Sequence, residues 1–179
     1  SNTKLVKYEQ LDFENIPYRL RHCFHEPVFP LKSHAYVFNK YFSHPFYDYQ
    51  VFGVIRNGLI IGIAIFRVCS FNSSYSLRLV EYIGPGHALG NLYEELQKLL
   101  QYYDAEYVDL YNMGIDQRYF LTSGFLKRSQ RSNVQVPNYF EPFNKNSIDL
   151  NFAFKQLNND DINFSIYKAD SDQDRPNLV

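Results

Sequence analysis

A glycine-containing turn is the strongest candidate in this sequence for binding an anion. It holds Gly84, Gly86 and Gly90 and leads into residues 89–103, where leucine and tyrosine recur at helical spacing. The first N–H groups of a helix have no partner inside the helix, and the helix dipole favours negative charge there. We therefore expect the N–H groups from His87 to Asn91 to form an anion site. The alternative is a plain strand-to-helix turn.

Three residues near this turn are candidates for moving protons. Glu81 lies inside the apolar run 79–83, where a charge is costly unless it faces water or a site. Strand alternation groups it with Leu79 and Ile83, so a solvent-facing position is the alternative to a catalytic one. His87 in the turn is the second candidate, and Asp109 is the third.

The elements that position these residues are predicted by local patterns. Two β-rich runs, 49–56 and 59–69, are joined by Asn57-Gly58, which favours a type I′ hairpin turn. Residues 70–74 predict a polar loop, 75–83 a third strand and 106–111 a fourth. Because a helix separates the third and fourth strands, we expect them to be parallel. The fold class is therefore α/β, with a central mixed sheet flanked by helices.

The remaining elements have weaker signals. We predict a strand at 5–8 and helices at 12–24, 33–42 and 115–122. Further strands are predicted at 125–128, 133–136, 148–154 and 163–168. With neither an internal repeat nor a break in composition, residues 3–169 form one predicted domain, and 170–179 form a polar C-terminal tail.

Composition excludes several classes of function. A net charge of −1 offers no basic field for nucleic acid, and the longest apolar run, 59–66, is too short to span a membrane. Two cysteines do not make a disulfide framework, and the histidines show no metal-ligand spacing, so we expect a cytoplasmic protein without a metal.

Aromatic residues make up 18% of the chain, which suits crevices and interfaces as well as a β-rich core. The segment 136–143 combines aromatic rings with Asn138, Tyr139 and Glu141. Such a set suits a sugar, and it equally suits a subunit contact in a homodimer. A second aromatic group lies between Tyr36 and Tyr49, and we expect it on the other side of the same cleft.

The order of these elements resembles the GNAT superfamily of acyl-CoA-dependent N-acyltransferases over nearly the whole chain. Three local features carry the resemblance: the Asn57-Gly58 hairpin, the glycine turn before the helix, and the short helix bracketed by Asn112 and Gly124-Phe125. The turn departs from the family pattern. It lacks the usual Arg or Gln before G-x-G/A, and no Arg or Lys lies between Arg78 and Lys98. The acyl-CoA pyrophosphate loop is therefore degenerate.

The resemblance implies a transferase that moves an acetyl or other acyl group from acetyl-CoA or another acyl-CoA to a small-molecule amine. Glu81 or His87 would help deprotonate the amine, and Tyr119 would protonate the leaving thiolate. Counting back from Gly124-Phe125 instead places that role on Phe120, but one extra residue in the connection favours Tyr119. Cofactor contacts are implied at the strand end, the turn and one later position: Tyr82, Ile83, Gly84, Gly86, His87, Ala88, Leu89, Gly90, Asn91 and Asn112.

The acceptor suggested by 136–143 is an amino-sugar nucleotide of surface-polysaccharide synthesis. Two other functions stay open. The first is a GNAT-shaped domain that has no catalytic activity and serves as a binding or dimerisation module. A Tyr or Phe ring filling the cleft beside Gly86 would favour the module. The second alternative is a relative of the peptidoglycan aminoacyl transferases, which use aminoacyl-tRNA.

Overall fold

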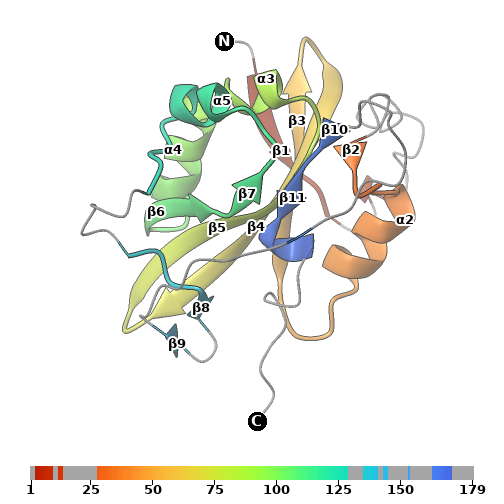
Figure 1. Ribbon diagram of the computed structural model, residues 1–179. Helices are drawn as coiled ribbons and strands as arrows, with labels where there is room; N and C mark the ends of the chain where they lie inside the picture. Colours follow the sequence, from red (N-terminus) through yellow and green to blue (C-terminus); the bar gives the residue numbers. More distant parts are fainter. Residues whose placement is uncertain are drawn as a thin grey trace.

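A five-stranded mixed sheet forms the centre of the fold (Figure 1). The computed structural model describes residues 3–9, 12–13, 28–128, 135–140, 143–144, 153 and 163–170. The strand order is β1–β3–β4–β5–β6, antiparallel throughout except for the parallel pair β5–β6. The strands are β1 (Thr3–Lys7), β3 (Tyr49–Arg56), β4 (Leu59–Phe71), β5 (Ser74–Ile83) and β6 (Ala105–Leu110). The predicted mixed sheet and the parallel pair are confirmed.

Two tight turns build the antiparallel meander. Asn57 and Gly58 have φ angles of 52° and 77°, the positive values that a type I′ turn requires. Asn72 and Ser73, with φ of 49° and 67°, make a second two-residue turn. The polar loop predicted at 70–74 is therefore wrong, because β4 and β5 continue to within two residues of each other.

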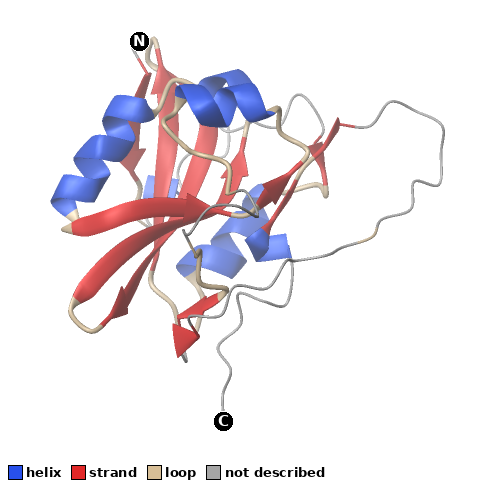
Figure 2. Ribbon diagram, turned by 60° about the vertical axis from the view of Figure 1, so that its left-hand side comes forward, coloured by secondary structure: helices blue, strands red, loops and turns tan. Residues whose placement is uncertain are grey.

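Helices cover both faces of the sheet (Figure 2). One face packs on α2 (His34–Val37), which Ser33 caps and which continues as the wider helix η2 (Phe38–Phe42). The other face packs on α3 (Gly86–Leu89) and α4 (Tyr93–Tyr102), with α5 (Gln117–Thr122) beside them. Of the predicted helix at 12–24, only Asp12 and Phe13 lie within the described residues, and both are helical.

Each face has its own hydrophobic core, because side chains alternate across the strands. Ile63 and Ile65 point toward α2, whereas Ala64 and Phe66 point toward α4. On the predicted buried side of the helix, Leu89, Leu92, Leu96 and Leu99 are buried, and Leu100 and Tyr103 are partly buried. Tyr93, predicted on the same side, is 51% exposed, so that part of the prediction is wrong. Among the described residues, no helix combines the length and apolar character needed to cross a bilayer.

Short strands complete the described structure. They are β2 (Val28–Phe29), β7 (Asn112–Met113), β8 (Tyr139–Phe140), β9 (Phe143–Asn144), β10 (Asn163–Phe164) and β11 (Ile166–Tyr167), followed by the 3₁₀ helix η3 (Lys168–Asp170). β10 and β11 confirm the strand predicted at 163–168, interrupted at Ser165. The strand predicted at 125–128 is wrong, since these residues are irregular. Those predicted at 133–136 and 148–154 lie largely outside the described residues.

A buried ion pair fixes how β5 and β6 lie against each other. The Arg78 guanidinium donates to both carboxylate oxygens of Asp109, at 2.7 and 2.6 Å, and to the carbonyls of Pro137 and Asn138. Arg78 and Asp109 are paired residues in the strand register and are almost completely buried. Asp109, the third candidate base, is thereby committed to a structural contact.

We expect Asp109→Ala to lower the free energy of unfolding by about 3–5 kcal/mol, because it leaves a buried guanidinium without its counter-charge. Urea unfolding checks this. The double variant Arg78→Met/Asp109→Leu, which removes both charges, should recover most of the loss. A single-variant loss below about 1 kcal/mol would show that the pair is not the constraint described here.

Candidate functional site

A cleft of about 360 Å³ opens where β5 and β6 separate. Leu79 of β5 and Leu110 of β6 are the last paired residues of the two strands. Beyond them β5 continues to Ile83, whereas β6 ends and is followed by β7. The cleft is lined by Val28, Pro30, Leu31, Lys32, Glu81, Tyr82, Ile83, Gly84, Pro85, Gly86, His87, Gly114, Ile115, Asp116, Tyr119, Phe164, Ser165 and Tyr167. It therefore brings together seven of the predicted site residues: Glu81, Tyr82, Ile83, Gly84, Gly86, His87 and Tyr119.

A β-bulge in β5 decides where Glu81 points. Ile65 of β4 pairs with Glu81 and the next residue, Phe66, pairs with Leu79, so Val80 is an extra residue. The bulge shifts the alternation by one position, as bulges near functional sites often do. Leu79 faces the α4 side, whereas Glu81 faces the α2 side. The predicted grouping of Glu81 with Leu79 is therefore wrong.

The Glu81 carboxylate is completely buried, with 0% of the residue exposed. Its Oε1 forms an ion pair with Lys32, and its Oε2 accepts hydrogen bonds from the hydroxyls of Tyr41 and Tyr36, the latter at 3.2 Å. A charge inside a protein needs such partners to offset the loss of water. The solvent-facing alternative for Glu81 is thus excluded.

The two phenols are fixed as hydrogen-bond donors. Burial raises the pKa of Tyr36 and of Tyr41 far above the usual value, and the negative charge of Glu81 raises both further. Both hydroxyls therefore stay protonated at any physiological pH. Lys40 adds a second cation: it donates to the Tyr36 hydroxyl at 2.8 Å and to the carbonyl of Ala169.

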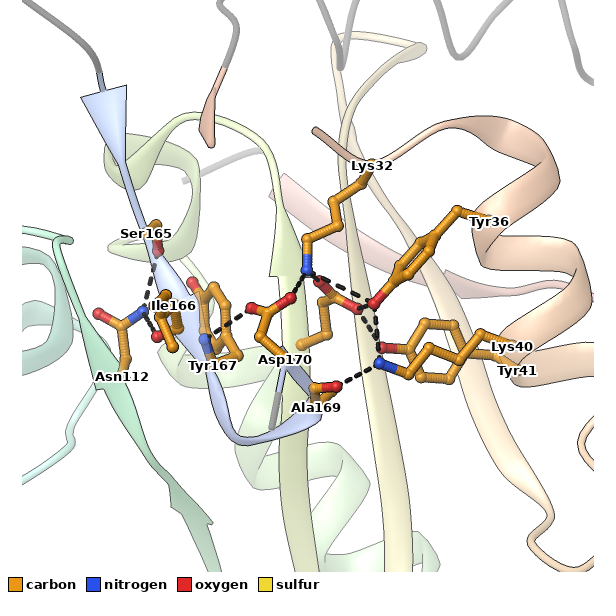
Figure 3. Close-up of polar contacts among 11 residues, drawn as sticks. Lys32, Tyr36, Lys40, Tyr41, Asn112, Ser165, Ile166, Tyr167, Ala169 and Asp170 are labelled. Atoms are coloured by element: carbon orange, nitrogen blue, oxygen red, sulfur yellow. Dashed lines mark hydrogen bonds and ion pairs between the residues drawn. The ribbon is translucent and has the colours of Figure 1, made fainter. Parts of the chain in front are cut away.

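Residues 163–170, here called the strap, form one wall of the cleft. Asp170 at its end pairs with Lys32 and accepts a hydrogen bond from the Tyr167 N–H at 2.9 Å (Figure 3). Asp170 was predicted to begin a polar tail, but only this residue of 170–179 is described, and it is tied into the structure. Lys32 thus joins the strap to Glu81 on the central sheet.

Asn112 anchors the middle of the strap. Its side-chain amide donates to the Ser165 hydroxyl and the Ile166 carbonyl, both at 3.0 Å (Figure 3). Its oxygen accepts from the Ile115 N–H. Nearby, Gly114 has φ +113°, and a Cβ there would lie 1.8 Å from the Phe164 carbonyl oxygen. Asn112 does not line the cleft, so it supports the cleft wall and does not face its interior.

The glycine turn offers fewer free N–H groups than predicted. The N–H groups of Ala88, Gly90 and Asn91 donate to the carbonyls of Pro85, Gly86 and Ala88. Ala88 and Leu89 are buried in the core, and α3 is one short turn separated from α4. In place of the range His87 to Asn91, the first-turn N–H groups of Gly86 and His87 are the donors that have no partner within the helix.

His87 and Tyr119 lie on the α3 and α5 side of the cleft. His87 is exposed, whereas Tyr119 is half-buried with its ring against the backbone of Gly86. A Cβ at Gly86 would lie 2.6 Å from Cδ2 of Tyr119, so only glycine permits this contact. Phe120, the other residue considered for the Tyr119 role, packs in the hydrophobic core.

The predicted acceptor segment lies outside the cleft. The Asn138 carbonyl accepts from Arg78 and Lys168, and Phe143 stacks on Phe71 at the far end of the β4–β5 hairpin. Tyr139 pairs through its backbone with Asn144, and Glu141 lies outside the described residues. None of the described part of 136–143 lines the cleft.

Sequence reasoning missed Lys32, Asp170, Ser165 and Tyr167. Lys32, Ser165 and Tyr167 line the cleft, and Asp170 pairs with Lys32. Long-range pairings of two-residue strands bring these segments together, and the sequence carries no periodic signal for such strands. The aromatic group between Tyr36 and Tyr49 was expected to line the cleft. Most of it packs in or against the core facing α2 instead, whereas Phe46 is exposed. Within this group, Tyr36 and Tyr41 donate hydrogen bonds to Glu81. Among the described residues, no three side chains are grouped as a metal site.

We expect Lys32→Met to lower the free energy of unfolding by about 3–5 kcal/mol, because Glu81 and Asp170 stay buried without their shared cation. Tyr41→Phe should lower the free energy of unfolding by about 1–3 kcal/mol, since Tyr36 still donates to Glu81.

Lys7→Met is the control for Lys32→Met. It removes an exposed ion pair with Glu9 (3.4 Å) and should change the free energy of unfolding by less than about 1 kcal/mol. Equal losses for the two lysine variants, measured by urea unfolding, would contradict the role assigned to Lys32.

Comparisons with known proteins show no family. No family model matches the chain, and no curated protein matches it. One solved structure with a similar shape is the crystal structure of wild-type TTHA1254 from Thermus thermophilus. The two share 14% sequence identity with a TM-score of 0.46, over 74% of this chain and 96% of that chain.

Proposed function

We propose that this protein is an N-acyltransferase that moves an acyl group from acyl-CoA to an amine. One observation carries the proposal. A single cleft lies at the point where β5 leaves β6. It is lined by the proposed proton-transfer residues Glu81, His87 and Tyr119 and by Gly84 and Gly86 of the glycine turn. A cleft with convergent polar groups at the diverging edge of a sheet is a common kind of ligand site.

The acyl-CoA would enter from the side of the turn. Gly84 and Gly86 line the cleft, but the space where a side chain would lie is filled by the protein, by the backbone of Ile61 and Gly62 at Gly84 and by the Tyr119 ring at Gly86. The N–H groups of Gly86 and His87 are the donors that we assign to the cofactor, a smaller set than the resemblance implied. We therefore expect acyl-CoA to bind mainly through its thioester and pantetheine parts, which lie deeper in the cleft than the phosphates.

The transfer needs one group that accepts a proton and one that donates a proton. The amine attacks the thioester carbonyl, the carbon–sulfur bond breaks, and the thiolate takes a proton from Tyr119. Either Glu81 or His87 accepts the proton of the amine: His87 is exposed, whereas Glu81 is buried beside Lys32. The amino-sugar nucleotide loses its support, because the described part of 136–143 lies away from the cleft.

A catalytically inactive binding module is the second candidate, and one observation favours it. The Tyr119 ring covers Gly86, which narrows the approach to the turn. The 360 Å³ that stay open argue for a ligand site.

Titration calorimetry and thermal unfolding with acetyl-CoA test the binding step. At a concentration 100 times Kd the ligand should raise the free energy of unfolding by about 2.7 kcal/mol. Absence of both heat and stabilisation at millimolar acetyl-CoA would reject the acyltransferase.

Tyr119→Phe tests the chemical step. The ring stays against Gly86, so acetyl-CoA binding should be unchanged, while turnover falls roughly 10²–10⁴-fold because the acid is lost. Tyr93→Phe, at an exposed tyrosine outside the cleft, is the matched control and should keep full turnover. If both variants lose the same activity, or neither does, Tyr119 is not the acid.

A further inference from the structure

The cleft already contains a primary amine supplied by the protein itself. Lys32 is the one lysine among the described residues that line the cleft, and only 8% of its side chain is exposed. Its Nζ contacts Oε1 of Glu81 and Oδ1 of Asp170, and it lies 5.0 Å from the centre of the Tyr36 ring. The neighbouring Lys40 belongs to the same cluster but does not line the cleft.

The two carboxylate oxygens of Glu81 have different partners. Both phenols donate to Oε2, whereas Oε1 has no hydrogen bond of normal geometry among the described residues and faces the ammonium. Transfer of one proton from Nζ to Oε1 turns the ion pair into two neutral groups. Asp170 then keeps its hydrogen bond from the Tyr167 N–H but no longer faces a charged Lys32, so the exchange has an electrostatic cost at Asp170.

We propose that Lys32 is itself an acyl acceptor of the cleft, an inference that rests on the proposed acyl-CoA activity. One proton of the Lys32 ammonium passes to Glu81, and the neutral Nζ attacks the thioester carbonyl. The new carbon–nitrogen bond replaces the carbon–sulfur bond. A second proton passes from the nitrogen to the leaving sulfur through the Tyr119 hydroxyl, which is restored. The products are an amide at Lys32 and free CoA.

Acylation of Lys32 changes the wall of the cleft. The amide has no charge, so Glu81 and Asp170 both lose their shared cation. Asp170 ties the end of the strap to Lys32, and the strap supplies Phe164, Ser165 and Tyr167 to the lining. Acylation therefore removes the ion pair that holds the end of the strap and makes the Lys32 side chain bulkier. The shape of the cleft then depends on whether Lys32 is acylated.

Peptide mass mapping after incubation of the full chain with acetyl-CoA tests the proposal. We expect one acetyl group on Lys32 at a rate at least about tenfold above that of Lys98, because the reacting groups are held together in one cleft. Uncatalysed acetylation favours exposed amines, and the Lys98 side chain is 67% exposed against 8% for Lys32. The preference for Lys32 should disappear when the protein is unfolded in urea.

Lys32→Arg is the matched variant, since arginine keeps the charge between Glu81 and Asp170 but is not acylated under these conditions. It should show no label at this position, and Lys40 should stay unlabelled in both proteins. Acetyl-CoA binding without preferential labelling of Lys32 would overturn this proposal alone. Failure of the wild type to bind acetyl-CoA would overturn the proposed function, and this proposal with it.

Discussion

The buried carboxylate of Glu81 is the constraint that organises this structure. It lies where the sheet opens and is itself completely buried, so its charge must be balanced by partners from elsewhere in the chain. Lys32 comes from the segment before α2, Tyr36 from α2, and Tyr41 from η2. Because Lys32 also binds Asp170, the same charge holds the strap in place. The cleft is the space that these connected segments enclose with the glycine turn.

Local patterns in the sequence predicted the frame of the fold and failed at the cleft. Asn57-Gly58 and the spacing of Leu92, Leu96 and Leu99 each act within a few residues, so the hairpin and α4 were predictable. The bulge at Val80 adds one residue to β5 and reverses the face of Glu81, which strict alternation cannot anticipate. The ion pair between Lys32 and Asp170 joins residues 138 positions apart, and no local sequence pattern predicts such a contact.

The kind of ligand that the cleft can bind depends on how its charged side chains are paired. Lys32 and Lys40 oppose Glu81 and Asp170, so the four formal charges of the cluster sum to zero. The glycine turn has few free N–H groups, and the described cleft lining has no further lysine or arginine to hold phosphates. For the proposed acyl-CoA ligand we therefore expect binding chiefly by shape and by neutral hydrogen bonds.

The location of a bound cofactor tests the account most directly. A crystal structure of the protein with saturating acetyl-CoA should show the thioester between Gly86 and Lys32, with the Tyr119 hydroxyl facing the sulfur. The strands β5 and β6 should stay paired as far as Leu79 and Leu110, since the cleft is already open beyond them. Acetyl-CoA bound at any other surface, with the cleft holding only water, would contradict the assignment of this cleft as an acyl-transfer site.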